Sequence, residues 1–154
     1  MNRASPQMRN FASRLITLEA AEKNASGAIG SPVFPVPEKL RPALSILMGS
    51  GGFRALLARA LTLAAGEVPW LRGVTVNDDG SLEGWEKLHA HLGPEKFREG
   101  RVVLVAQLLG LLEAFIGASL TVRLVSEIWP KLSLSDLNLD KGEKNEKRSK
   151  TGQA

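Results

Sequence analysis

Residues 101–129 form a nearly continuous apolar stretch, which constrains the fold of this chain more than any other feature. The longest run without a charged residue in this stretch, 102–112, is eleven residues long. A helix needs about 20 apolar residues to cross a bilayer, and Glu113 and Arg123 interrupt the apolar residues after this run. The stretch therefore predicts a helix buried at the centre of a folded domain, and no transmembrane segment.

Small residues recur along this stretch at steps of three or four positions. They let the backbone of a second helix approach closely, because no long side chains hold it away. Two are glycines, and each glycine costs about 1 kcal/mol relative to alanine inside a helix. We therefore expect either a close helix crossing, within one chain or between two, or a kink near Gly117. The expected helix-packing or interface residues are Ala106, Gly110, Ala114, Gly117 and Thr121.

The composition favours an all-α fold. The chain holds 24 Leu and 17 Ala against 10 Val and 5 Ile, and straight-chain and small residues favour helices whereas strands use β-branched ones. The sequence NDDG at 77–80 is typical of a tight turn. We expect a compact bundle of four to six helices around a long apolar C-terminal helix, with one small hairpin at 74–83.

Prolines, glycines and charges indicate how the chain is divided. Three prolines within six residues favour an extended linker, and Gly49 is expected to separate helices at 38–48 and 51–66. Nine charges among the last nineteen residues favour a solvated tail. The expected organisation is an N-terminal arm (1–23), a linker (24–37), a single helical domain (38–135) and a disordered charged tail (136–154).

The net charge of +4 does not predict a nucleic-acid partner. Residues 37–135 carry eleven bases and ten acids, so the expected domain is nearly neutral, whereas a duplex-binding domain gathers Lys and Arg on one face. The chain has no cysteine, which excludes thiol nucleophiles, disulfides and cysteine-bound metals. The absence of cysteine also fits the cytoplasmic location that we expect.

Two segments mimic metal sites. Residues 75–86 match the spacing of a calcium loop except at its first ligand, where Thr75 stands in place of a carboxylate. Glu86 and His89 are three residues apart, as in di-iron bundles, but those bundles need the pair twice. An Asp-Gly turn followed by a polar helix explains the same residues, so we expect no metal and no cofactor.

Three charged residues are candidates for ligand binding. Arg54 and Arg59 lie on one face of the helix expected at 51–66, whose N-terminal amides favour anions; the Lys-Ser/Thr ending of a phosphate loop is missing, however. Glu113 lies in the most apolar helix, where an ionised carboxylate needs a partner. Glu113 is explained either by a structural salt bridge with Arg54, Arg59 or Arg123, or by a functional role of its carboxylate.

Four blocks, GGFRALLARALTLAAGEVPWL, VNDDGSL, LLGLLEAFIG and LTVRLVSEIWP, resemble a family of small bacterial helical proteins. The resemblance covers about residues 38–131. It implies a bacterial, soluble, helical protein and brings no catalytic residues to this chain.

No arrangement of residues typical of catalysis is found in the sequence, so we expect no enzyme. The first hypothesis is a non-catalytic protein-interaction or regulatory module that self-associates through an apolar helix face. The second is a small-molecule or anion sensor that uses Arg54 and Arg59. The third is attachment to a membrane surface through an amphipathic helix at 6–22, whose apolar residues recur at helical spacing.

Overall fold

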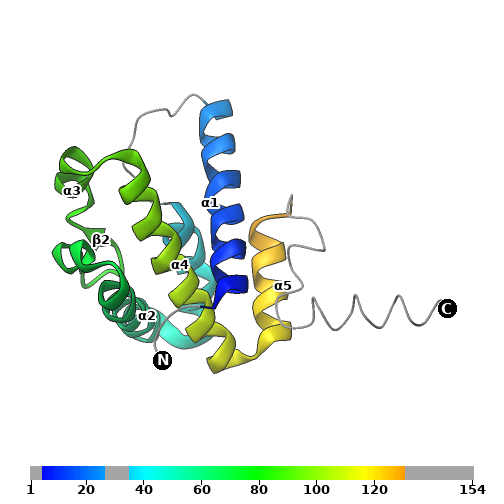
Figure 1. The fold of residues 1–154 in the computed structure, drawn as a ribbon. Helices are drawn as coiled ribbons and strands as arrows, with labels where there is room; N and C mark the ends of the chain where they lie inside the picture. Colours follow the sequence, from blue (N-terminus) through cyan, green and yellow to red (C-terminus); the bar gives the residue numbers. More distant parts are fainter. Residues whose placement is uncertain (1–4, 27–34, 131–154) are drawn as a thin grey trace.

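The computed structural model describes residues 5–26 and 35–130, which form a mostly helical fold with one small hairpin (Figure 1). Four longer helices make up most of it, and a short helix, a 3₁₀ turn and two strands connect the second of them to the third. In chain order the elements are α1 (Pro6–Ser26), α2 (Pro35–Glu67), η1 (Pro69–Gly73), β1 (Thr75–Val76), β2 (Leu82–Glu83), α3 (Trp85–His91), α4 (Pro94–Ile116) and α5 (Ala118–Ile128).

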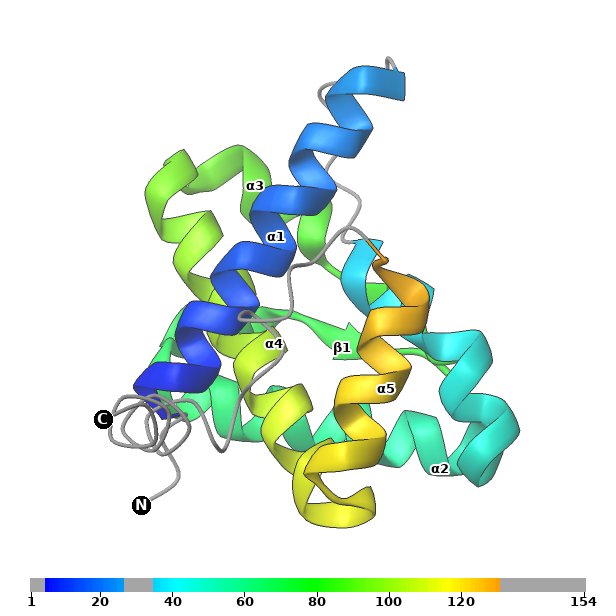
Figure 2. The same ribbon diagram turned by 90° about the vertical axis from the view of Figure 1, so that its right-hand side faces the viewer.

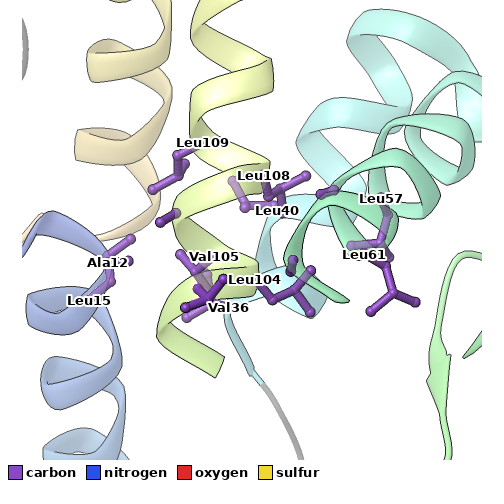
Figure 3. Close-up of a cluster of buried hydrophobic side chains, with 14 of the residues drawn as sticks. Ala12, Leu15, Val36, Leu40, Leu57, Leu61, Leu104, Val105, Leu108 and Leu109 are labelled. Carbon is purple, nitrogen blue, oxygen red and sulfur yellow. The ribbon is translucent and has the colours of Figure 1, made fainter. Parts of the chain in front are cut away.

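Helix α4 lies at the centre of the fold. It packs against α1 on one side and α2 on another, and α5 folds back beside it (Figures 1 and 2). Residues 103–109 of α4, about two turns, are all buried, and a helix segment that is buried all round is covered on more than one side. In Figure 3 the side chains of Leu15 (α1), Leu40 and Leu57 (α2) and Leu108 (α4) meet in one cluster. Each leucine buried there stabilises the fold by about 1.5–3 kcal/mol.

The prediction of one long apolar C-terminal helix over 101–129 is wrong. The chain forms two helices there, because Gly117 adopts φ 92 and ψ 157, a backbone conformation that glycine reaches easily and an α-helix cannot contain. The kink expected near Gly117 is therefore confirmed as a complete break. The long apolar helix of the structure is α2.

Helix α2 consists of two helical segments that meet at Gly49 (φ 82, ψ 157), where the sequence predicts a break. It begins with Pro35 and Pro37, which we expected in the linker; proline suits a first helical turn because the N–H it lacks would have no helical partner there. By length and composition α2 could cross a membrane, which is weak evidence alone. In the structure Gly49 interrupts it, and Leu40 and Phe53 are buried in the core of the fold.

The expected N-terminal arm is a helix docked on the rest of the chain. Phe11, Ala12 and Leu15 of α1 are buried, and α1 lies against α4. On the polar side of this contact, Arg98 donates a hydrogen bond to Ser13 Oγ at 2.7 Å. The residues of α1 therefore belong to the same hydrophobic core as those of α2 and α4.

Two buried carboxylates connect α1 to the other helices. Glu67, at the end of α2, forms an ion pair with Arg9 of α1 and accepts a hydrogen bond from Gln107 Nε2 of α4 at 2.7 Å. Glu19 of α1 is the second carboxylate. Its Oε2 lies 2.6 Å from Lys39 Nζ and accepts a hydrogen bond from Trp129 Nε1 at 2.5 Å.

These pairings have a clear physical basis, because a buried charge without a partner destabilises a fold by several kcal/mol. Glu67 and Glu19 each have both a cationic and a neutral donor. These donors offset the cost of burying the two carboxylates, and because they come from other helices they also hold α1 in position.

The small hairpin that we expected at 74–83 is confirmed. Strands β1 and β2 pair antiparallel, with Thr75 opposite Glu83 and Val76 opposite Leu82. A two-stranded hairpin is marginal alone. Next to it, the rings of Trp70, Trp85 and Phe97 pack together with centroids 5.1–6.0 Å apart.

The N-terminal residues 1–4, most of the expected linker (27–34) and the segment 131–154 lie outside the described residues. The charged tail expected at 136–154 is therefore not tested.

Candidate functional site

Two helix corners have nearly identical backbone geometry. Gly49 and Gly117 have φ values of 82° and 92°, and both have ψ 157°. At the second corner, the Gly117 N–H donates to the Glu113 carbonyl at 2.8 Å. The Gly117 carbonyl then accepts from Thr121 Oγ1 at 2.8 Å and from the Thr121 N–H at 3.1 Å. The corner is thus held by hydrogen bonds on both sides of the glycine.

Large hydrophobic side chains are exposed at these corners. In the part of the chain that the structure describes, four such side chains are exposed, and each lies within three residues of Gly49 or Gly117. They are Ile46 (88% exposed), Leu47 (48%), Phe115 (65%) and Leu120 (38%). We call these four residues the corner surface. Exposed apolar residues that gather in one region commonly mark an interaction site.

Both corners lie at the same end of the molecule, the lower end in Figures 1 and 2. Their helices are also in contact, because α2 packs against both α4 and α5. Residues far apart in the sequence are therefore brought to one end by the fold. Sequence reasoning missed all four side chains, because hydrophobic residues of similar spacing in α2 and α4 are buried.

The corner surface lies in two runs of the sequence that carry no charge, 42–53 and 114–122. The nearest charged residue after the first run, Arg54, forms an ion pair with Asp78, with Nη1 3.2 Å from Oδ1. Protein interfaces are depleted of charge at their centres and surrounded by a polar rim. The uncharged runs match the composition of such a centre.

The three candidate ligand-binding residues lie on two helices, α2 and α4. Arg54 and Arg59 are both exposed on α2, and Arg54 is paired with the turn residue Asp78. Glu113 is half-buried in the last turn of α4. Of the arginines expected to pair with Glu113, Arg54 therefore has a different carboxylate partner.

The five expected packing residues do not form one face within the chain. Ala106 and Thr121 are buried, whereas Ala114 and Gly117 are exposed, and Gly117 lies between two helices. A Cβ atom added to Gly110 would meet no described atom within 4 Å, so none of the helices that the structure describes approaches closely there. At Gly100, outside the expected stripe, it is a side chain that approaches α4 closely: an added Cβ would lie 2.2 Å from Trp70 Cζ2.

We expect opposite effects of the same substitution at these two glycines. Gly110→Ala should raise the free energy of unfolding by about 0.5–1 kcal/mol, because alanine favours the helix and meets no neighbour. Gly100→Ala should lower it by about 1–3 kcal/mol, because the half-buried Trp70 must move. Urea denaturation of both variants measures the difference. If Gly110→Ala instead lowered the free energy of unfolding, it would support the close helix packing at Gly110 that the sequence predicts.

The segment that mimics a calcium loop is organised by its own hydrogen bonds. Asp79 Oδ1 accepts from Ser81 Oγ at 2.6 Å and from the Ser81 N–H at 3.0 Å, and these bonds lower the pKa of the Asp79 carboxyl below its ordinary value. Asn77 Nδ2 also donates to Ser81 Oγ. Among the described residues, no group of three or more His, Asp or Glu side chains could hold a metal ion. The side chains of Glu86 and His89 are not described.

Comparisons of the chain with protein-family models, with curated proteins and with solved structures found no match. The resemblance to small bacterial helical proteins therefore stays a prediction.

Proposed function

We propose that this chain is a non-catalytic interaction module that binds a protein partner through the corner surface. The observation that carries the proposal is the exposure of Ile46, Leu47, Phe115 and Leu120 beside the two helix corners, in a fold whose other large hydrophobic residues are buried or half-buried in the described part. Aromatic residues, including Phe, are enriched in protein interfaces, where a few side chains supply most of the binding energy.

The other two hypotheses have less support. An anion sensor requires Arg54 to be available, and Arg54 is paired with Asp78. Membrane attachment through 6–22 requires apolar residues such as Phe11 and Leu15 to face the lipid, whereas both are buried against the rest of the fold. Membrane attachment through this helix would therefore require the fold to lose buried contacts that stabilise it.

The proposal predicts that Phe115→Ser weakens binding without weakening the fold. Truncation of a central interface residue commonly costs at least ~2 kcal/mol of binding energy, or a factor of about 30 in affinity. An exposed residue changes the free energy of unfolding by about 0.5 kcal/mol or less. We therefore expect proteins retained by the immobilised wild-type chain to be lost with Phe115→Ser, at an unchanged Tm.

Ala90→Ser on α3 is the matched control, because Ala90 is exposed and α3 lies at the opposite end of the molecule in Figures 1 and 2. This variant should retain the same proteins as the wild type. Equal retention by Phe115→Ser and the wild type would contradict the proposed function.

A further inference from the structure

The polar contact between α1 and α4 is centred on Arg98, a half-buried residue in the second turn of α4. Its Nη2 donates to Ser13 Oγ at 2.7 Å, to Thr17 Oγ1 at 3.1 Å and, more weakly, to the Ser13 carbonyl at 3.4 Å. All three acceptors are neutral. Two other half-buried arginines, Arg9 and Arg41, each form an ion pair with a carboxylate. Among the residues that the structure describes, no acidic group balances the positive charge of Arg98 in this way.

The groups around this contact are donors that the fold does not use fully. An arginine has five N–H groups, and the contacts with α1 use only those on Nη2 of Arg98; the N–H groups on Nε and Nη1 donate to no residue in the described part of the chain. The hydroxyls of Ser13 and Thr17 accept from Arg98, and each also has an O–H to donate. Elsewhere, the hydroxyls of Thr62 and Thr121 donate to the carbonyl four residues earlier. Within the described helix α1, neither Ser13 nor Thr17 makes such a bond.

A second guanidinium group lies near Arg98. Arg101 is three residues further along α4, a spacing that places the two side chains next to each other, and its Cζ lies 5.2 Å from the centre of the Phe97 ring. Burial, and after it the charge of Arg98, lower the pKa of Arg101 below its ordinary value. Glu95 and Glu99, the nearest acids in sequence, are exposed, and neither forms an ion pair with Arg98 in the described structure. An anion bound beside the two arginines therefore offsets their repulsion.

We propose that Arg98, Ser13 and Thr17 form a binding site for a phosphate group where α1 meets α4. Arginine binds phosphate through two parallel N–H···O bonds. A phosphate ester offers three strong acceptor oxygens, whereas a carboxylate has two, so a phosphate group can use the hydroxyls and the arginine together. The contacts with α1 already hold the Arg98 side chain, so binding costs little of its rotational freedom.

The phosphate site is separate from the corner surface. Arg98 and Phe115 are 17 positions apart in α4, which at 1.5 Å per residue is about 25 Å. Ser13 and Thr17 belong to α1, and none of the four residues of the corner surface does. The phosphate site is therefore independent of the proposed function, and the failure of one leaves the other standing.

Isothermal titration calorimetry of the full chain with inorganic phosphate, at constant ionic strength, tests the site. Arg98→Gln removes the charge and the N–H fork, and should weaken phosphate binding at least tenfold. Arg59→Gln is the matched control, because it removes one positive charge from an exposed position of α2 and should bind phosphate as the wild type does. Titration with glycerol 3-phosphate distinguishes the two sources of the group: a natural ligand that is a phosphate ester predicts tighter binding than inorganic phosphate, and free phosphate predicts the reverse.

Thr17→Val separates ligand binding from the structural role of Arg98, which also joins α1 to α4. Thr17 is exposed, and valine keeps its shape but lacks the hydroxyl. This variant should keep the Tm of the wild type, measured by circular dichroism, and weaken phosphate binding about two- to tenfold. A wild type that binds neither probe would overturn the site. Unchanged binding in Thr17→Val, or equal weakening in Arg59→Gln and Arg98→Gln, would overturn it as well.

Discussion

Trp129→Ala is expected to lower the free energy of unfolding by about 3–5 kcal/mol. The Trp129 side chain is 1% exposed and directly follows α5, so its removal leaves a cavity in the core. Trp129 Nε1 also donates to Glu19 Oε2 at 2.5 Å, and the buried carboxylate would lose this donor. An average domain is stable by only about 5–15 kcal/mol, so the loss is a large share of the total.

Urea denaturation followed by circular dichroism measures this effect, and two further variants separate its causes. Trp129→Phe keeps a large ring but removes the N–H, and should cost about 1.5–3 kcal/mol, the range for a hydrogen bond to a charged group. Glu127→Ala changes an exposed residue of α5 and should stay within about 0.5 kcal/mol of the wild type. If Trp129→Ala were as stable as Glu127→Ala, Trp129 would not be a core residue.

Features determined by neighbouring residues could be predicted from the sequence. The breaks at Gly49 and Gly117 and the turn at 77–80 depend on glycine, which adopts positive φ at little cost, and on short-range hydrogen bonds such as that from Gly80 N–H to the Asn77 carbonyl. The mostly helical secondary structure likewise follows from the preferences of individual residues, which act locally. These signals need no knowledge of the remaining chain.

Features that depend on distant residues could not be predicted. Glu19 and Trp129 are 110 positions apart, and neither has a local pattern that identifies the other as its partner. In the stripe expected from Ala106 to Thr121, the two end residues are buried within the chain whereas Ala114 and Gly117 are exposed, and the sequence does not distinguish them for the same reason. Helical periodicity predicts which residues share a face, but it does not tell which part of the face another helix covers. In α4 the close approach comes from Trp70 at Gly100.

The candidate site shows both cases. Its two uncharged runs, 42–53 and 114–122, and the corner glycine within each can be recognised in the sequence, and they could have been predicted as candidate interface segments. The exposure of Ile46 could not have been derived in that way, since Leu44, two residues earlier, is fully buried. Which of two neighbouring hydrophobic residues faces the solvent is decided by the packing of α2 on the other helices.

The second large effect is expected at Gly84, where Gly84→Ala should lower the free energy of unfolding by roughly 2–4 kcal/mol. Gly84 has φ 103, a conformation that costs alanine about 1–3 kcal/mol. An added Cβ would also lie 2.5 Å from the Gly73 carbonyl oxygen. That oxygen belongs to the backbone and cannot turn away as a side chain can, so the segment joining η1 to β1 must shift.

Gly66→Ala is the control for this prediction. Gly66 lies in the last turn of α2, where an added Cβ meets nothing within 4 Å, so the variant should be as stable as the wild type or more stable by up to about 1 kcal/mol. Near-ultraviolet circular dichroism adds a local readout, because Trp85 directly follows Gly84 and packs against Trp70 and Phe97. We expect Gly84→Ala to change this signal and Gly66→Ala to leave it unchanged. A Gly84→Ala chain with the stability and spectrum of the wild type would contradict the close contact between Gly84 and Gly73.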